Sequence, residues 1–131
     1  VGAGGAGSAI AHALVLGGVS ELAIHDPDLS RRDTLIARLA SLGLGAVVAG
    51  SPDPSGVDIA LHATPIGMKE SAPHPMDSSK FTPAMFVGCV ITAPAVTPMI
   101  AAARATGCDT MTGADMFAQV RDLMVNFLLG N

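Results

Sequence analysis

Residues 1–7 read Val1-Gly2-Ala3-Gly4-Gly5-Ala6-Gly7, and this stretch decides how the rest of the chain is interpreted. Its first, second and last glycines fit the spacing G-x-G-x-x-G. In that pattern the first glycine permits a tight turn, the second lets the backbone approach a pyrophosphate, and the third lets a helix pack closely on a strand. The chain holds 15 glycines, so an ordinary glycine turn is the alternative interpretation.

The residues after the loop favour a dinucleotide site. Residues 7–16 predict a helix that opens on the loop, and residues 21–25 predict a strand that leads into Asp26. An acid about 20 residues after the loop completes the Rossmann fingerprint, because its carboxylate accepts both ribose hydroxyls of NAD. The same charge repels the 2′-phosphate of NADP, so we favour NAD over NADP. Arg31 and Arg32 keep NADP open, because an arginine near this point can pair with that phosphate.

Short apolar runs alternate with helical stretches along the chain, which predicts an α/β fold with a Rossmann-type doubly wound parallel sheet. A glycine loop of this kind should follow a complete strand, so we expect the first strand to be truncated at the amino terminus. Proline-rich residues 64–84 predict a loop. Beyond Asp26 we expect helices over 30–42, with Ser30 as the N-cap, over 98–107 and over 113–129, and strands over 46–49, 57–62, 85–91 and 108–111.

The composition argues against several classes of protein. Half of the residues are hydrophobic and the mean hydropathy is +0.51, yet no apolar run reaches the roughly 20 residues that span a bilayer. We therefore expect buried parallel strands covered by helices. A net charge of −4 with seven basic residues argues against a nucleic-acid surface. Cys89 and Cys108 form neither a disulfide framework nor a metal-ligand pattern, which favours a reduced, cytoplasmic location.

Three further segments resemble one enzyme family. His62-Ala63-Thr64-Pro65-Ile66-Gly67-Met68 resembles the Asn-Ala-Thr-Pro-x-Gly-Met segment of the shikimate/quinate dehydrogenases. Thr97-Pro98-Met99-Ile100 with Gly107 resembles the family's Thr-Pro-Leu-Leu helix and its closing glycine. Gly113-Ala114-Asp115-Met116-Phe117 resembles its Gly-x-x-Met-Leu helix start. Asp26-Pro27-Asp28-Leu29-Ser30-Arg31 resembles the NAD-using branch, whereas NADP-using members carry Asn-Arg-Thr there.

The resemblance implies a two-domain enzyme. An N-terminal domain would supply most substrate contacts and a catalytic Lys–Asp pair, and residues 1–131 match only the C-terminal cofactor domain. We therefore expect a substrate-binding catalytic domain upstream, and we assign no catalytic residue and no metal ligand here. The expected partner is a small-molecule substrate in the interdomain cleft, without nucleic acid or membrane, and a homodimer is left open. The resemblance implies cofactor contacts at Ala3, Gly4, Gly5, Ala6, Asp26, Arg31, Thr64, Pro65, Met68, Gly113 and Met116.

Several positions depart from the family pattern. Its Asn is His62 here, its Asp-x-x-Tyr becomes residues 89–92 (Cys-Val-Ile-Thr), and its late helix Gln falls at Val120. Gln119 lies one position away, about 100° around a helix. A site that hydrogen-bonds hydroxyls loses orders of magnitude without such partners, so we expect a shikimate-dehydrogenase-like paralogue with a different or relaxed substrate.

Two of these departing residues have structural interpretations. We interpret His62 as a hydrogen-bonded structural histidine, with a role near the nicotinamide or the substrate as the alternative. We interpret Cys89 as a small buried hydrophobic residue, because nothing nearby in the sequence offers a base to activate its thiol.

Two functions from different classes follow. The first is an NAD-dependent dehydrogenase that transfers hydride between the nicotinamide and a cyclic hydroxy acid such as shikimate or quinate, chemistry of aromatic amino-acid biosynthesis. The second is a nucleotide-binding sensor or assembly module that has lost catalysis, and the lost Asp, Tyr and Gln motivate it. A relative of the folate-linked or glutamyl-transfer-RNA reductases is disfavoured by Thr64-Pro65 and by residues 113–116.

Overall fold

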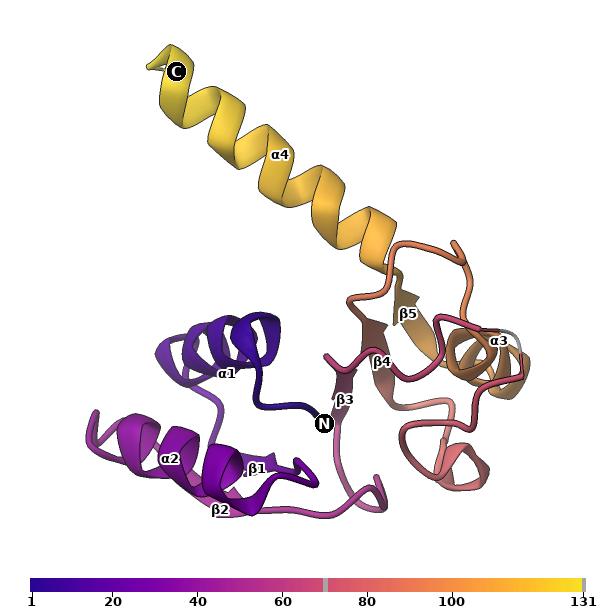
Figure 1. Ribbon diagram of the computed structural model, residues 1–131, viewed down its shortest axis with the longest axis horizontal. Helices are drawn as coiled ribbons and strands as arrows, with labels where there is room; N and C mark the ends of the chain where they lie inside the picture. The colour runs from indigo at the N-terminus through magenta and orange to yellow at the C-terminus, as the bar shows by residue number, and fades with distance from the viewer. Residues whose placement is uncertain (70, 131) are drawn as a thin grey trace.

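The chain folds into parallel strands and helices, which confirms the expected α/β class (Figure 1). The computed structural model describes residues 1–69 and 71–130. The helices are α1 (Gly5–Leu16), α2 (Leu29–Ala40), α3 (Pro98–Thr106) and α4 (Gly113–Leu129), with a short 3-10 helix η1 (Ser78–Lys80). The strands are β1 (Glu21–Ile24), β2 (Ala46–Ala49), β3 (Ile59–His62), β4 (Phe86–Cys89) and β5 (Asp109–Met111).

The strands form two sheets, not the single sheet expected from the sequence. β1 pairs with β2, and a separate sheet has the order β3-β4-β5, all in parallel register. Val1 and Gly2 bridge the two sheets at the carboxyl ends of β1 and β3. The Gly2 amide donates to the His25 carbonyl oxygen at 2.8 Å, and the Val1 amino group donates to the Leu61 carbonyl oxygen at 2.7 Å. The Ala63 amide donates back to the Val1 carbonyl oxygen at 2.8 Å.

Val1 and Gly2 contact only the carboxyl ends of β1 and β3. Along the rest of their length, β1 and β3 border a groove of about 440 Å³, whose wall includes Leu22 from β1 and Ile59 from β3.

Side-chain caps fix where the helices begin. Thr97 caps α3 and Pro98 occupies its first turn, as the sequence predicts. The predicted N-cap of α2, Ser30, is wrong: Asp28 occupies that position, and its Oδ1 accepts from the Arg31 amide at 3.0 Å. An aspartate suits the position better than a serine, because its negative charge also meets the positive end of the helix dipole.

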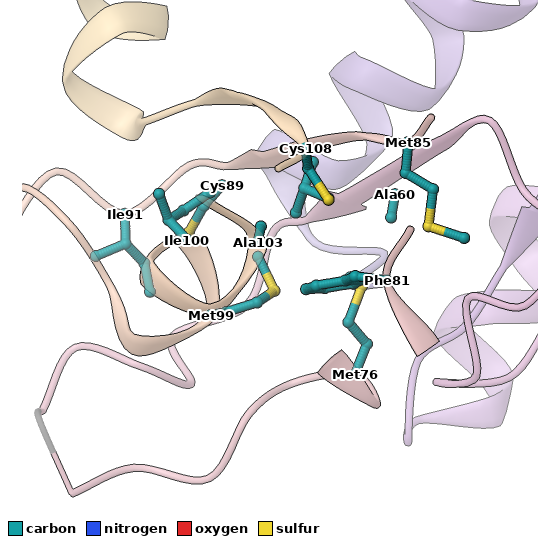
Figure 2. Close-up of a cluster of buried hydrophobic side chains, with 11 residues drawn as sticks. Ala60, Met76, Phe81, Met85, Cys89, Ile91, Met99, Ile100, Ala103 and Cys108 are labelled. Atoms are coloured by element: carbon teal, nitrogen blue, oxygen red, sulfur yellow. The ribbon is translucent and has the colours of Figure 1, made fainter. Parts of the chain in front are cut away.

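Each sheet has its own cluster of buried side chains. α1 and α2 cover the sheet of β1 and β2 with a small aliphatic cluster that includes Val15, Ile24 and Leu35. α3 packs on β4 and β5 over a cluster rich in sulfur-containing side chains, shown in Figure 2. Methionines fill the space that larger aromatic rings often occupy. The residues of this second cluster are Ala60, Met76, Phe81, Met85, Val87, Cys89, Ile91, Met99, Ile100, Ala103 and Cys108.

Helix α4 extends away from the two sheets (Figure 1). Its large apolar side chains are exposed, and Phe127 is 84% exposed. At 100° per residue, the exposed side chains Phe117, Val120, Leu123, Met124, Phe127 and Leu128 fall on one face of the helix. No helix in the described part of the chain has both the length and the apolar character to cross a membrane.

Candidate functional site

The glycine loop forms a tight turn between Val1 and α1. Gly2 has φ of +100°, and a Cβ there would lie 2.5 Å from the Ala63 carbonyl oxygen. A Cβ on Gly7 would collide with the Gly2 carbonyl oxygen. By contrast, a Cβ on Gly4 or Gly5 would have no other atom within 4 Å. Gly2 and Gly7 therefore shape the turn, while Gly4 and Gly5 leave open space in front of the helix.

The amino end of α1 borders that open space. Gly4 is the N-cap and has no side chain to accept from the first-turn amides, and α1 begins at Gly5. Free amides at a helix N-terminus, together with the positive end of its dipole, bind phosphate groups. The residues present therefore fit a pyrophosphate. Ala3, on the other side of the turn, is buried.

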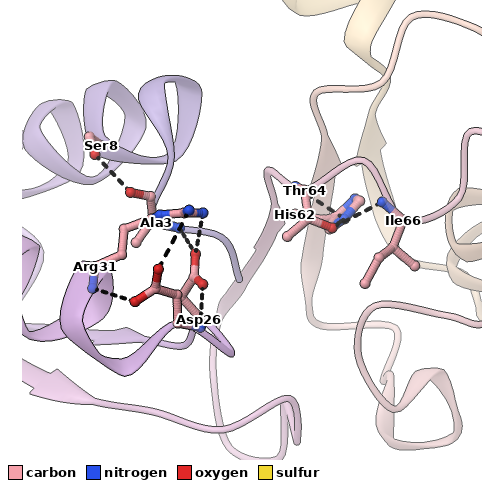
Figure 3. A network of polar contacts seen from close by, with 8 residues as sticks. Ala3, Ser8, Asp26, Arg31, His62, Thr64 and Ile66 are labelled. Carbon is pink, nitrogen blue, oxygen red and sulfur yellow. Dashed lines mark hydrogen bonds and ion pairs between the residues drawn. The ribbon is translucent and has the colours of Figure 1, made fainter.

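Asp26 lies directly beneath the loop and is 4% exposed. Its Oδ2 accepts from the Ala3 amide at 2.8 Å, and its Oδ1 accepts from the Asp28 amide at 2.8 Å (Figure 3). Burial alone raises the pKa of Asp26, but these two amides and the nearby Arg31 outweigh it and hold the pKa below its ordinary value. The carboxylate is therefore ionised at neutral pH, and each oxygen keeps a lone pair for a further donor.

The two arginines of this region are both paired with acids. Arg31 lies between two carboxylates, with Nη1 3.8 Å from Asp26 Oδ2 and Nη2 3.6 Å from Asp28 Oδ2. Arg32 donates from Nε to Asp33 Oδ1 at 2.8 Å, on the surface of α2. To bind an additional phosphate, either arginine would have to give up an acidic partner.

A cleft of about 1070 Å³ lies at the carboxyl ends of β1 and β3. Asp26 and Arg31 line one side of it, and Thr64 and Pro65 line the other. In doubly wound α/β folds, ligands bind at this edge, where strand order reverses. The structure therefore gathers four of the predicted cofactor contacts around one cleft, with Ala3 bonded to Asp26.

The remaining predicted contacts lie outside the lining of this cleft. Gly113 opens α4 against the backbone of the segment after β4, where a Cβ would collide with the Val90 and Ile91 carbonyl oxygens. A Cβ on Gly67 would lie 3.7 Å from Ile91 Cδ1, so the loop after β3 also approaches Ile91. Met68 is exposed and Met116 is partly buried. In residues 1–69 and 71–130, no three His, Cys, Asp or Glu side chains are grouped as metal ligands.

One arrangement was missed in the sequence. His62 and Cys89 are register partners at the ends of β3 and β4, both 1% exposed. His62 Nδ1 lies 3.3 Å from Cys89 Sγ, so a ring nitrogen does stand beside the thiol, although 27 residues separate the two in the chain. The available signal was that both positions depart from the same family pattern.

The comparisons with known proteins agree with this geometry. The chain is 37% identical over 123 residues to the NAD(+) quinate/shikimate dehydrogenase of Corynebacterium glutamicum, which covers 88% of this chain and 43% of the relative. The crystal structure of quinate dehydrogenase from Corynebacterium glutamicum in complex with NAD matches with a TM-score of 0.78, over 88% of this chain and 43% of that one. The chain belongs to the shikimate/quinate dehydrogenase family. It matches the C-terminal NAD(P)-binding region, and spans less than half the length of these relatives.

Other proteins similar to this chain are named for a different cofactor or substrate. The NADP(+) shikimate dehydrogenase of Streptomyces avermitilis is 35% identical over 122 residues, which is 88% of this chain and 42% of the relative. The ligand-free 5-ketofructose reductase of Gluconobacter sp. strain CHM43 matches with a TM-score of 0.87 and 33% identity, over 99% of this chain and 49% of that one. No family model matches the chain.

Proposed function

We propose that this chain is the NAD-binding domain of an oxidoreductase that transfers hydride between the nicotinamide ring and a small cyclic hydroxy acid of the shikimate or quinate type. The observation that carries the proposal is the buried, ionised Asp26 beneath the glycine loop, 2.8 Å from the Ala3 amide. When bound, NAD supplies the hydride-accepting ring. The chain's own residues hold the pyrophosphate at the start of α1 and the adenosine ribose at Asp26.

The charges around Asp26 favour NAD over NADP. A 2′-phosphate at this point would meet the carboxylates of Asp26 and Asp28. It could recruit Arg31 only by drawing the guanidinium away from both acids. The relatives named above include NAD(+) and NADP(+) enzymes of similar identity, so this preference rests on the local charges.

The rest of the proposed enzyme is a second domain that binds the substrate and supplies the catalytic residues. The relatives are more than twice as long as the region that matches this chain, which supports such a domain. We also propose that a strand preceding Val1 runs parallel between β1 and β3 and joins the two sheets into one doubly wound sheet. Val1 and Gly2 already make the bonds of such a strand to His25, Leu61 and Ala63.

We propose that the substrate differs from shikimate, or that the selection among cyclic hydroxy acids is relaxed. The positions where the family carries Asp, Tyr and Gln hold Cys89, Thr92 and Val120 here, and Cys89 is buried away from any cleft substrate. The likeness to 5-ketofructose reductase covers nearly the whole chain, which supports a small polyhydroxylated ketone as the second substrate class to test.

The test uses the full-length protein. Calorimetry should show NAD binding that is tighter than NADP binding. Turnover should appear with NAD and at least one of shikimate, quinate or another cyclic hydroxy acid, or with NADH and 5-ketofructose. Tighter binding of NADP than of NAD would overturn the cofactor assignment.

A second candidate is a nucleotide-binding sensor or assembly module without catalysis. The buried Cys89–His62 pair favours it, because Cys89 stands at a position where the family carries an acid. Tight NAD binding with no turnover of any of these substrates would select the sensor and overturn the dehydrogenase.

A further inference from the structure

We propose that His62 is a positioning residue of the cofactor cleft, which is anchored on Cys89 and orients Thr64 together with the loop after β3. This inference rests on the proposed NAD-binding function. It assigns a role to a pair of residues that differ from the family pattern, and it replaces the interpretation of Cys89 as simple packing.

The anchor is the sulfur of Cys89. His62 Nδ1 lies 3.3 Å from Cys89 Sγ on the adjacent strand. The Thr97 hydroxyl donates to the same sulfur at 3.9 Å, and Thr97 Oγ1 accepts from the Ile100 amide at 3.3 Å as the cap of α3. The sulfur therefore connects the ends of β3 and β4 to the start of α3, and it gives the His62 ring a fixed acceptor.

The hydrogen bonds on the other ring nitrogen define the tautomer. The Thr64 amide donates to His62 Nε2 at 3.2 Å, and a backbone amide can donate only to an unprotonated nitrogen. The ring proton therefore sits on Nδ1 and donates to the Cys89 sulfur. Burial lowers the pKa of His62 to about 4. The neutral ring that this pattern needs is thus the stable form at neutral pH.

Thr64 is the residue that His62 orients. Its hydroxyl shares the Nε2 lone pair of His62 with the Thr64 amide, at an Oγ1–Nε2 distance of 2.5 Å, and the same oxygen accepts from the Ile66 amide at 3.2 Å (Figure 3). Thr64, Pro65 and Ile66 line the 1070 Å³ cleft opposite Asp26. The chain of bonds from Cys89 through His62 therefore fixes the wall of the cleft that faces the cofactor.

The test separates positioning from simple core packing by comparing two buried cysteines. Cys89 accepts from His62, whereas Cys108 donates to the Thr82 carbonyl oxygen at 3.2 Å, at the opposite ends of β4 and β5 from His62. In the full-length protein, Cys89→Ala should weaken NAD binding about tenfold, the effect of losing one ordered hydrogen bond. Cys108→Ala should lower the unfolding temperature but leave the Kd for NAD unchanged.

Two further measurements address the mechanism itself. Cys89→Ser keeps an acceptor for the His62 ring and should restore most of the NAD affinity. The ¹⁵N chemical shifts of the His62 ring should show a proton on Nδ1 in the wild-type protein and should change in Cys89→Ala but not in Cys108→Ala.

The outcomes separate this inference from the proposed function. Absence of NAD binding by the wild-type protein would overturn the proposed function and, with it, the role in a cofactor site. Wild-type binding that Cys89→Ala and Cys108→Ala weaken equally would overturn the inference alone. A His62 proton on Nε2 would also overturn it, whatever the nucleotide affinity.

Discussion

At the scale of single residues, Asp26 combines burial with a negative charge that the glycine loop itself stabilises. Asp26→Asn keeps the side-chain shape but removes the charge and places an NH₂ group against a backbone amide. Because hydrogen bonds to charged groups contribute about 1.5–3 kcal/mol, we expect the Kd for NAD to rise at least about tenfold. Calorimetry with both nucleotides should also show that the preference for NAD over NADP is smaller than in the wild-type protein.

The matched control is Asp122→Asn, which removes an exposed charge on α4, paired with Arg121, away from the residues that line the cleft. It should leave both affinities as they are. If the ratio of the Kd for NADP to the Kd for NAD is the same in Asp26→Asn as in the wild-type protein, the cofactor preference does not come from Asp26.

His62 also makes the stability of the fold depend on pH. Its pKa falls from 6.5 to about 4 on folding, so the unfolded chain binds more protons between these two values. The contribution of neutral His62 to the free energy of unfolding should therefore be at its maximum above about pH 6.5. The free energy of unfolding should decrease as the pH falls toward 4, by up to about 3 kcal/mol. The pKa of Asp26 is lowered from 3.8, so protonation of this carboxylate reduces the free energy of unfolding only at pH values below that range.

Urea unfolding at a series of pH values would measure this dependence. His62→Gln should flatten the curve between pH 6.5 and 4, whereas His12→Gln on the exposed face of α1 should not. If the wild-type protein is equally stable throughout that interval, the conclusion that His62 is buried in its neutral form is wrong.

At the scale of elements, the turn into α1 separates glycines needed for folding from glycines needed for binding. Gly7→Ala should destabilise the protein, because its Cβ would collide with the Gly2 carbonyl oxygen. Gly4→Ala has open space and should leave the unfolding temperature nearly unchanged, yet its methyl group would occupy the place proposed for the pyrophosphate. Thermal unfolding and NAD calorimetry on both variants would test this, and unaltered NAD binding by Gly4→Ala would contradict the proposed placement.

Helix α4 presents an apolar face that burial would stabilise. Each large side chain that leaves water contributes about 1.5–3 kcal/mol, so we expect the 131-residue chain to pair with a second copy through this face. The double variant Leu123→Gln, Phe127→Gln should shift sedimentation velocity profiles toward the monomer. Leu129→Gln, an equally exposed position outside the face, should not, and a monomer at every concentration would contradict the prediction.

The elements also differ in how well the sequence predicts them. α3 and α4 begin where predicted: Thr97-Pro98 is a local signal in the sequence, and the structure adds a Thr112–Asp115 capping box at the start of α4. The start of α2 was misplaced, since Asp28 and Ser30 are both good caps and only the folded geometry chooses between them. β3 and β4 are shorter than their apolar runs, because pairing with neighbouring strands ends before the run of apolar residues does.

At the scale of the whole molecule, long-range register is the part that the sequence could not provide. The loop and Asp26 were predictable because a strand ending at the acid returns it to the loop, as the Ala3–Asp26 bond confirms. The His62–Cys89 contact depends on which residues of β3 and β4 stand side by side, and a shift of one residue would turn one side chain to the other face. Likewise, the strand pattern predicted parallel strands but not their separation into two sheets.

The separation of β1 and β2 from β3, β4 and β5 also bears on how the fold opens. Each sheet is built from consecutive segments of the chain, and the bonds of Val1 and Gly2 join their carboxyl ends. In residues 1–131 on their own, such halves can act as separate foldons, each with its own opening free energy, whereas a strand that precedes Val1 and joins the sheets would make them open together; amide hydrogen exchange would distinguish the two cases. With separate foldons, the hydrogen-bonded amides of Gly2 and Ala63 would exchange with whichever half is less stable, so the cofactor loop would be only as protected from solvent as the weaker of the two sheets.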